Sequence, residues 1–255
     1  EFGITGIFTK TLDVAMLTDT IDIAVHSMKD VPTALPKGIV EGAVMKRAHT
    51  QDLLIHKGTD FLEGEGTIAT GSLRRKAQWL NRFPDHKVVD LRGNVNTRLQ
   101  KLEDSAWNGA IFAAAGLERI NLKPESYLDL DWMIPAPAQG AMLIVAKEED
   151  DFCRKALTAL NHEKPMICVH IEREFLRTLE GGCTAPIGAL AVIEGNEIHF
   201  KGALFSIDGT RKFEVEKRIS ASESSGLGKR CAEEILASGG AELMKEIKAK
   251  LDKKE

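Results

Sequence analysis

Short apolar strands alternate with amphipathic helices through the middle of the chain, and this alternation constrains the fold more than any other feature. The expected elements are strand 67–69, helix 72–83, strand 87–91, helix 95–104, strand 110–114 and a short helix near Leu117. Strands that alternate with helices build βαβ units, in which crossover helices cover a parallel sheet. The sequence therefore predicts an α/β lobe with parallel strands.

A second α/β region brackets the first one in sequence. An amphipathic helix over 7–17 leads into strand 21–25, which we expect to be buried and parallel, and apolar stretch 39–45 follows. Strand 141–146 and helix 150–160 come only after the segment Pro135 to Gly140, which is rich in proline. We expect this segment to be a return crossing between two lobes. It and the segment from Lys46 to Thr50 are the predicted hinges.

The last third of the chain predicts a smaller α+β domain. A helix ending at Leu179 precedes a hairpin of strands 189–193 and 197–204, strand 212–219 and helices 226–237 and 241–251. The predicted domains are 1–45 with 141–163, then 51–138, then 166–255. Only six residues precede the first helix, and a strand–crossover–strand unit needs an earlier strand, so we expect an N-terminal segment of the first domain to be missing.

The charge and the cysteines exclude several function classes. A net charge of −4 argues against a surface built for nucleic acid or an anionic membrane. There is no long apolar stretch, and the four cysteines show neither a Cys-x-x-Cys pair nor a disulfide framework. A metal centre is not expected, and the composition indicates a cytoplasmic protein.

One of those cysteines, Cys183, lies in the run Leu-Glu-Gly-Gly-Cys-Thr-Ala-Pro. Two glycines remove side-chain cover and a proline limits the freedom of the loop, so the thiol is presented to its surroundings. Such a thiol suits covalent chemistry, anchoring or metal binding. An ordinary loop cysteine is an equally good interpretation of this run by itself.

Charged side chains follow several of the predicted strands. The sequence His-Ser-Met-Lys-Asp-Val-Pro over 26–32 comes directly after strand 21–25, where ligands of open α/β sheets bind. Three later strand exits carry arginine: Arg74 and Arg75, Arg92 and Arg98, and Arg119. Two cations in the first turn of a helix interact unfavourably with the helix dipole. Their placement there is easier to explain if an anion binds between them and the backbone amides. Five guanidinium groups at one sheet edge predict a ligand with several carboxylates.

These motifs together resemble the porphobilinogen deaminase family, also called hydroxymethylbilane synthase. The resemblance rests on four collinear segments that span most of the chain, Val-His-Ser-Met-Lys-Asp-Val-Pro at 25–32, Gly-Ser-Leu-Arg-Arg at 71–75, Leu-Arg-Gly-Asn-Val-Asn-Thr-Arg at 91–98 and Leu-Glu-Gly-Gly-Cys at 179–183. It implies two lobes like those of periplasmic binding proteins, with parallel or mixed sheets, plus a smaller C-terminal α+β domain.

The resemblance also implies an activity. The family is a transferase of tetrapyrrole and haem biosynthesis that deaminates four porphobilinogen units and joins them head to tail into hydroxymethylbilane. The growing chain is built on a dipyrromethane cofactor, which a thioether attaches to the cysteine at the position of Cys183. The partners implied are porphobilinogen alone, with no nucleic acid or membrane, and the protein is expected to be a monomer.

Residue roles follow from the same motifs. Asp30 matches the catalytic aspartate, which stabilises positive charge and moves protons during deamination. The residues expected to bind the cofactor are Ser27, Lys29, Thr70, Ser72, Arg74, Arg75 and Arg98, beside Cys183. Those expected to face the substrate are Arg92, Arg98 and Arg119. The competing hypothesis is a non-enzymatic two-lobed module that binds polycarboxylates, because the architecture alone suits capture as well as catalysis.

Overall fold

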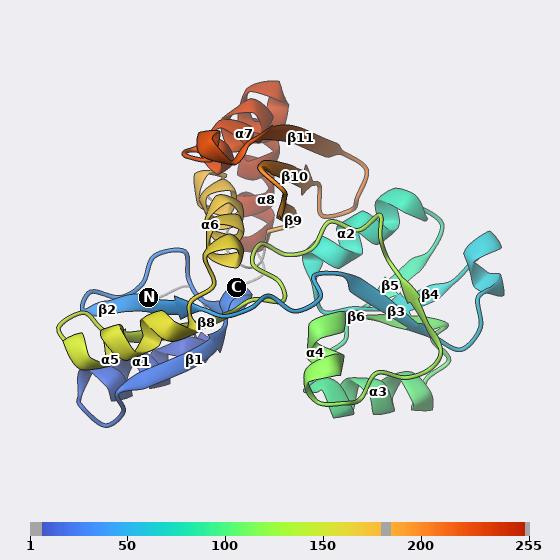
Figure 1. The fold of residues 1–255 in the computed structure, drawn as a ribbon. Coiled ribbons are helices and arrows are strands. Elements are labelled where there is room, and N and C mark those ends of the chain that lie inside the picture. Colours follow the sequence, from blue (N-terminus) through green and yellow to red (C-terminus); the bar gives the residue numbers. More distant parts are fainter. Residues whose placement is uncertain (1–6, 180–184, 253–255) are drawn as a thin grey trace.

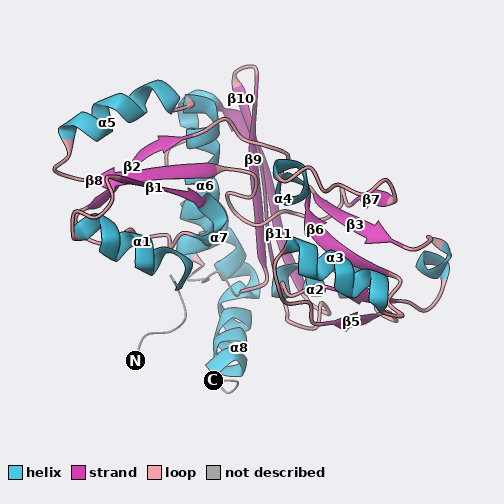
Figure 2. Ribbon diagram, turned by 90° about the horizontal axis from the view of Figure 1, so that it is seen from below, coloured by secondary structure: helices cyan, strands magenta, loops and turns pink. Residues whose placement is uncertain are grey.

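The computed structural model describes residues 7–179 and 185–252. Three sheets, each with its own helices, lie around a central crossing region (Figure 1). We call them lobe 1, lobe 2 and the C-terminal unit. The view from below in Figure 2 separates the three sheets clearly and shows α6 beside the sheet of lobe 1. The mixed α/β class expected from the sequence is confirmed.

Lobe 1 is built on a three-stranded sheet in the order β1-β8-β2. Its elements are α1 (Ile7–Leu17), β1 (Ile23–Ser27), the 3₁₀ turn η1 (Met28–Asp30), β2 (Ile39–Val44), β8 (Met142–Lys147), α5 (Asp151–Leu157) and η3 (Thr158–Leu160). The central strand β8 pairs antiparallel with both neighbours. The expectation that strand 21–25 is parallel is therefore wrong among the described strands. Its partner is β8, which follows the segment 135–140 and runs antiparallel to β1.

Lobe 2 has five strands in the order β5-β4-β6-β3-β7. Its elements are β3 (Asp52–His56), η2 (Asp60–Glu63), β4 (Thr67–Ala69), α2 (Leu73–Arg82), β5 (Lys87–Val89), α3 (Val95–Asp104), β6 (Gly109–Ala113), α4 (Ala114–Arg119) and β7 (Tyr127–Asp129). Parallel pairing holds for β4 with β5 and β6. The two strands that the sequence did not predict, β3 and β7, add antiparallel pairs at one side.

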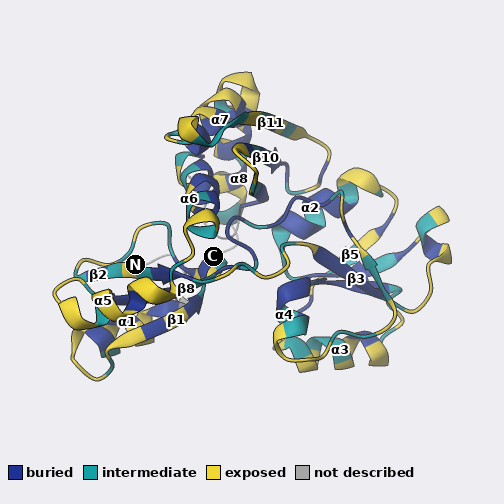
Figure 3. Cartoon of the chain, in the orientation of Figure 1, coloured by how far each residue is buried: buried dark blue, intermediate teal, exposed yellow. Residues whose placement is uncertain are grey.

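The C-terminal unit packs helices against an antiparallel sheet in the order β11-β10-β9. Its elements are α6 (Glu163–Thr178), β9 (Ile187–Glu194), β10 (Glu197–Phe205), β11 (Lys212–Ser220), η4 (Ala221–Glu223), α7 (Leu227–Ile235), the π turn η5 (Leu236–Gly240) and α8 (Ala241–Asp252). Phe175 and Phe200 are fully buried at its centre, with ring centroids 5.3 Å apart. Figure 3 shows β3, β8 and β10, one strand of each unit, as largely buried, whereas much of β11 and the outer helix faces are exposed.

Two extended segments cross side by side between the lobes, at the places predicted as hinges. The Ala48 amide donates to the Gly140 carbonyl at 3.1 Å, and Arg47 Nε donates to the Gln139 carbonyl at 3.0 Å. Gly140 has φ +83°, and a Cβ there would lie 2.7 Å from the Ala48 carbonyl oxygen. Only glycine fits so close a crossing.

A single buried carboxylate joins this crossing to the C-terminal unit. Glu172 of α6 is 0% exposed and accepts hydrogen bonds from both Nη atoms of Arg47, at 2.7 and 2.9 Å. It also accepts from the backbone amides of Ala138 and Ala191. Four donors satisfy the carboxylate, as a buried charge requires. The two crossing segments are thereby anchored to α6 and β9.

Among the described helices, none combines the length and the apolar character needed to cross a membrane.

Candidate active site

Lobe 1 presents its charged residues on η1, directly after β1. Met28 is fully buried and fixes the turn to the core, while Asp30 is exposed and Lys29 is half-buried. Arg173 of α6 holds the turn from below, donating to the carbonyls of Met28, Val31 and Pro32 at 3.1, 3.0 and 2.6 Å. The C-terminal unit therefore sets the position of the turn that carries Lys29 and Asp30.

Lys29 lies in a positively charged environment. Burial, and then the positive charge of Arg75, lower the pKa of its ammonium group to about 8, while Asp30 and Asp52 act in the opposite direction. Arg75 and Asp52 belong to lobe 2. The charge of η1 in lobe 1 therefore acts across the space between the lobes.

In lobe 2 the paired arginines at the start of α2 surround a buried aspartate. Asp52 begins β3 and is 0% exposed. Its Oδ1 accepts from Arg75 Nε at 3.1 Å, Arg75 Nη2 at 2.8 Å and Gln139 Nε2 at 2.9 Å. Its Oδ2 lies 2.8 Å from Arg74 Nη1, an ion pair outside hydrogen-bond geometry. Both arginines also donate to backbone carbonyls, Arg74 to Ile134 and Arg75 to Ile111.

The two arginines determine the ionisation of Asp52. Burial alone would raise the pKa of this carboxyl, but the charges of Arg74 and Arg75 outweigh burial and hold the pKa well below its usual range. Burial lowers the pKa of the Arg74 guanidinium. The chain thus supplies one anion of its own for the cations that oppose the helix dipole at α2.

The donors around this pair are only partly used. Arg74 Nε is buried and has no hydrogen-bond partner among the described residues. Thr70 Oγ1 accepts from the Ser72 amide at 3.2 Å, and Ser72 Oγ caps α2 by accepting from the Arg75 amide. Ser27 ends β1 at the opposite rim and is half-buried. A ligand carboxylate would satisfy the remaining guanidinium donor.

The next strand exit adds two more arginines. Burial, followed by the charges of Arg75 and Arg92, lowers the pKa of Arg98. Arg98 Nε donates to the Gly93 carbonyl at 2.7 Å, while Arg92 Nε pairs with Asp90 at 2.9 Å on the surface. Arg119 is exposed at the end of α4, and within the described residues its side chain makes no hydrogen bond or ion pair. Arg98 lies within range of the charges of Arg75 and Arg92.

These groups carry an excess of positive charge. The cations that act on one another are Lys29, Arg74, Arg75, Arg92 and Arg98, and the acids among them are Asp30, Asp52 and Asp90. Guanidinium groups bind carboxylates through paired hydrogen bonds. The donor set therefore fits a ligand with several carboxylates, such as dipyrromethane. Among the described residues, no group of three His, Cys, Asp or Glu side chains could hold a metal ion.

Sequence reasoning placed the arginines but missed the residues that hold them. Asp52, Gln139 and Arg173 were not singled out. A signal for Asp52 was present, because two arginines in the first turn of a buried helix require an anion, and an aspartate precedes the apolar run of β3. Nothing in the local sequence marks Arg173, whose partners lie more than a hundred residues away. Cys183, the predicted anchor, lies outside the described residues.

Comparison with known proteins agrees with this donor set. Residues 1–155 match the family model described as "Porphobilinogen deaminase, dipyromethane cofactor binding domain", and residues 166–237 match that of the porphobilinogen deaminase C-terminal domain. A porphobilinogen deaminase of Pelotomaculum thermopropionicum is 39% identical over 96% of this chain and 80% of the relative.

A second relative, a porphobilinogen deaminase of Carboxydothermus hydrogenoformans, is 40% identical over 97% of this chain and 81% of its own length. Among solved structures, an ABC transporter protein from Parabacteroides distasonis aligns with a TM-score of 0.42 and 14% identity over 59% of this chain and 57% of its own. The two family models and the curated relatives establish that the chain belongs to the porphobilinogen deaminase family.

Proposed function

We propose that this chain deaminates four porphobilinogen units and joins them head to tail into hydroxymethylbilane, on a dipyrromethane primer attached to Cys183. The observation that carries the proposal is the cation cluster around Lys29, Arg75 and Arg98, which two lobes contribute and the acids of the chain neutralise only in part. Each pyrrole unit of the substrate and of the primer bears two carboxylates. The cluster therefore matches a ligand whose negative charge grows with every addition.

The proposed division of roles keeps to the positions of the motifs. Carboxylates of the primer are bound by Lys29, Arg74, Arg75 and Arg98, with Ser27, Thr70 and Ser72 beside them. Carboxylates of the incoming substrate are bound by Arg92, Arg98 and Arg119. Once attached, the primer supplies the pyrrole carbon to which the first substrate unit is joined.

Asp30 is proposed as the catalytic acid and base. It is exposed on a turn that Arg173 and buried Met28 hold in place, so its carboxylate can meet the reacting pyrrole without reorganisation of the backbone. A carboxylate there stabilises the positive charge that develops as ammonia leaves, and it accepts or returns the proton of the pyrrole nitrogen. The ammonium group of Lys29, the preceding residue, offsets the negative charge of Asp30 when no substrate is bound.

The proposal includes the domain boundaries 1–45 with 141–163, 51–138, and 166–255, which are supported by the three sheets. It also includes a cytoplasmic monomer. Support for the reducing compartment comes from Cys153, Cys168 and Cys231, which are all free thiols. Sedimentation velocity of the full chain tests the monomer.

The attachment of the primer is tested by the intact mass of the purified chain. We expect the intact masses of the wild type and of Cys183→Ser to differ by more than the mass change of the substitution, because only the wild type carries dipyrromethane. Cys153→Ser, which removes a half-exposed thiol of lobe 1, is the matched control and should keep the added mass. The added mass in Cys183→Ser would contradict the anchor. A wild type of sequence mass alone would instead favour the non-enzymatic binding module.

Asp30 is tested separately from the anchor. Asp30→Asn should keep the added mass but lower kcat by about 10²- to 10⁴-fold, the usual effect of removing a general acid or base. Because Asp30 is exposed, the free energy of unfolding should change by less than about 0.5 kcal/mol. Asp85→Asn, another exposed aspartate of a loop, is the control. Near-normal bilane formation by Asp30→Asn would remove Asp30 from the catalytic role.

A further inference from the structure

A cavity of about 210 Å³ lies where α2 of lobe 2 meets the hairpin of the C-terminal unit. Its walls come from three separate parts of the chain: α2, the loop after β7 and the strands β10 and β11. The lining residues are Gln78, Asn81, Arg82, Trp132, Ile134, Phe205 and Lys212. None of them belongs to the proposed catalytic site. The contact between the two units is maintained by Ala77, Ile134, Ala203 and Phe205, which form one buried cluster.

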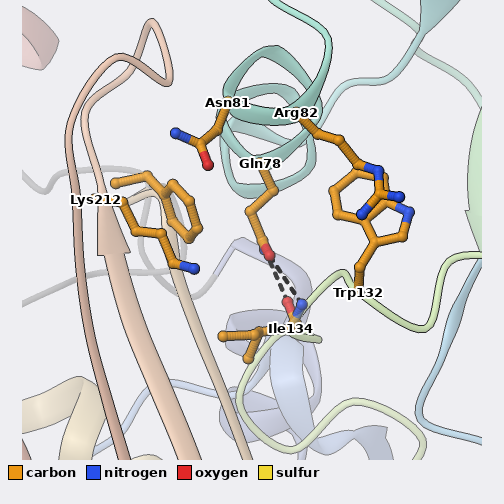
Figure 4. A pocket seen from close by; sticks show the side chains of 7 residues that line it. Gln78, Asn81, Arg82, Trp132, Ile134 and Lys212 are labelled. Carbon is orange, nitrogen blue, oxygen red and sulfur yellow. Dashed lines mark hydrogen bonds between the residues drawn. The ribbon is translucent and has the colours of Figure 1, made fainter.

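The amide side chains of the cavity already have partners. Gln78 is buried and pairs twice with the backbone of Ile134, donating through Nε2 and accepting through Oε1, both at 2.8 Å. Asn81 Nδ2 donates to the Gly209 carbonyl at 2.8 Å, which fixes the turn between β10 and β11. Figure 4 shows the Gln78–Ile134 pair between Arg82 on one side and Lys212 on the other. Because these amide groups already bond to the backbone, a ligand in the cavity would interact mainly with the two cations, Arg82 and Lys212.

Arg82 is oriented but its charge is not neutralised. Its guanidinium carbon lies 4.9 Å from the centroid of the Trp132 ring and 5.8 Å from that of Phe83. Within the described part of the chain, it makes no ion pair with a carboxylate. A guanidinium stacked on an aromatic face keeps its edge free for the two parallel hydrogen bonds that a carboxylate accepts.

Lys212 supplies a second cation from the opposite wall. Its ammonium lies 5.8 Å from the centroid of the Phe205 ring and pairs with Glu214 on the surface. An exposed pair of this kind contributes little free energy, so it competes weakly with a bound anion. None of the described residues that line the cavity is acidic. Two aromatic rings, Trp132 and Phe205, complete the walls.

We propose that this cavity binds a small organic carboxylate with a single apolar ring. Arg82 holds the carboxylate in bidentate fashion, Lys212 adds a second positive charge, and the ring packs against Phe205 and Ile134. Drug-sized ligands occupy pockets of roughly 300 to 1,000 Å³, so the smaller cavity selects a ligand of about one ring. Because the bound ligand contacts both α2 and β11, it links lobe 2 to the C-terminal unit and raises the melting temperature of the full chain.

Titration calorimetry of the full chain with benzoate tests this site. Benzoate should bind and raise the melting temperature, whereas benzamide, which is neutral, and acetate, which lacks the ring, should bind at least about ten-fold more weakly. Arg82→Gln should weaken benzoate binding by about ten- to a hundred-fold and Lys212→Gln by a few-fold. The matched controls are Arg154→Gln, an exposed arginine of lobe 1, and Lys217→Gln, a half-buried lysine of β11 that pairs with Glu234.

Arg82→Lys is a second variant in case Arg82→Gln misfolds. It keeps the positive charge and loses only the two parallel hydrogen bonds of the guanidinium group. It should bind benzoate with an affinity between those of the wild type and Arg82→Gln. The proposal is overturned by equal binding of benzamide, by unchanged binding in Arg82→Gln, or by no saturable benzoate binding in the millimolar range. Binding that is lost in Arg98→Gln but kept in Arg82→Gln would place the carboxylate in the cation cluster of the proposed active site instead.

Discussion

The two lobes hold their charged residues in opposite ways. In lobe 2, Arg74 and Arg75 are buried around Asp52, which holds both guanidinium groups in place and neutralises one of their two charges. In lobe 1, Lys29 and Asp30 sit on a short turn whose backbone, rather than whose side chains, is held by Arg173. Lobe 2 therefore offers a rigid framework of positive charge, and lobe 1 offers groups whose protonation can change.

This difference suits the chemistry proposed for each side. Guanidinium groups stay charged at any physiological pH, and a buried aspartate fixes their orientation before a carboxylate arrives. An exposed aspartate beside a lysine of lowered pKa can exchange protons with a reacting group. The comparison predicts that removing a buried charge in lobe 2 lowers the free energy of unfolding. Removing a charge in lobe 1 should instead lower mainly kcat and change the pH dependence of stability.

The largest expected effect is at Asp52. Asp52→Asn keeps the shape but leaves two buried guanidiniums without a counter-charge, which should lower the free energy of unfolding by about 3 to 5 kcal/mol. Urea unfolding followed by circular dichroism measures this loss. The control is Asp90→Asn, which breaks the exposed pair with Arg92 and should change stability by less than about 1 kcal/mol. Equal effects of the two substitutions would contradict the rigid framework assigned to lobe 2.

A smaller loss is expected at Arg173. Arg173→Gln removes charged hydrogen bonds to the carbonyls of η1 and the residues after it, at a cost of about 2 to 3 kcal/mol. Because the turn carries Asp30, kcat should also fall, and Arg173→Lys should restore part of both quantities. Arg177→Gln, on the exposed face at the end of α6, is the matched control. A loss of stability with kcat and KM unchanged would show that Arg173 supports the core and does not position Asp30.

A third effect concerns Lys29 and appears as a pH slope. Its pKa is about 8 in the folded protein against 10.5 in the unfolded chain, so between these values the unfolded state binds more protons. The destabilising contribution of Lys29 is therefore complete below pH 8 and is relieved as pH rises toward 10.5. The difference in unfolding free energy between wild type and Lys29→Met, measured across this window without bound primer, should shift in favour of the wild type. A flat difference would mean that burial and the charge of Arg75 do not lower the pKa of Lys29 in the folded protein.

Much of the architecture could be predicted from the sequence because the relevant signals are local. Apolar periodicity located most helices and strands to within a few residues, and proline and glycine located the crossing at 135–140. The two missed strands show the limit. Tyr127–Asp129 has only three residues, and the apolar run of Asp52–His56 lies outside the alternating pattern.

The charged and nucleophilic groups and their order along the chain, among them Asp30, Arg74 and Cys183, can be read from the amino-acid sequence alone. Which of these groups meet depends on how the chain folds. Asp52 neutralises an arginine pair more than twenty residues later, and Arg173 fixes a turn more than a hundred residues earlier. Such pairings arise because burying a charge is unfavourable unless a partner is brought to it, and the partner is chosen by packing rather than by sequence distance.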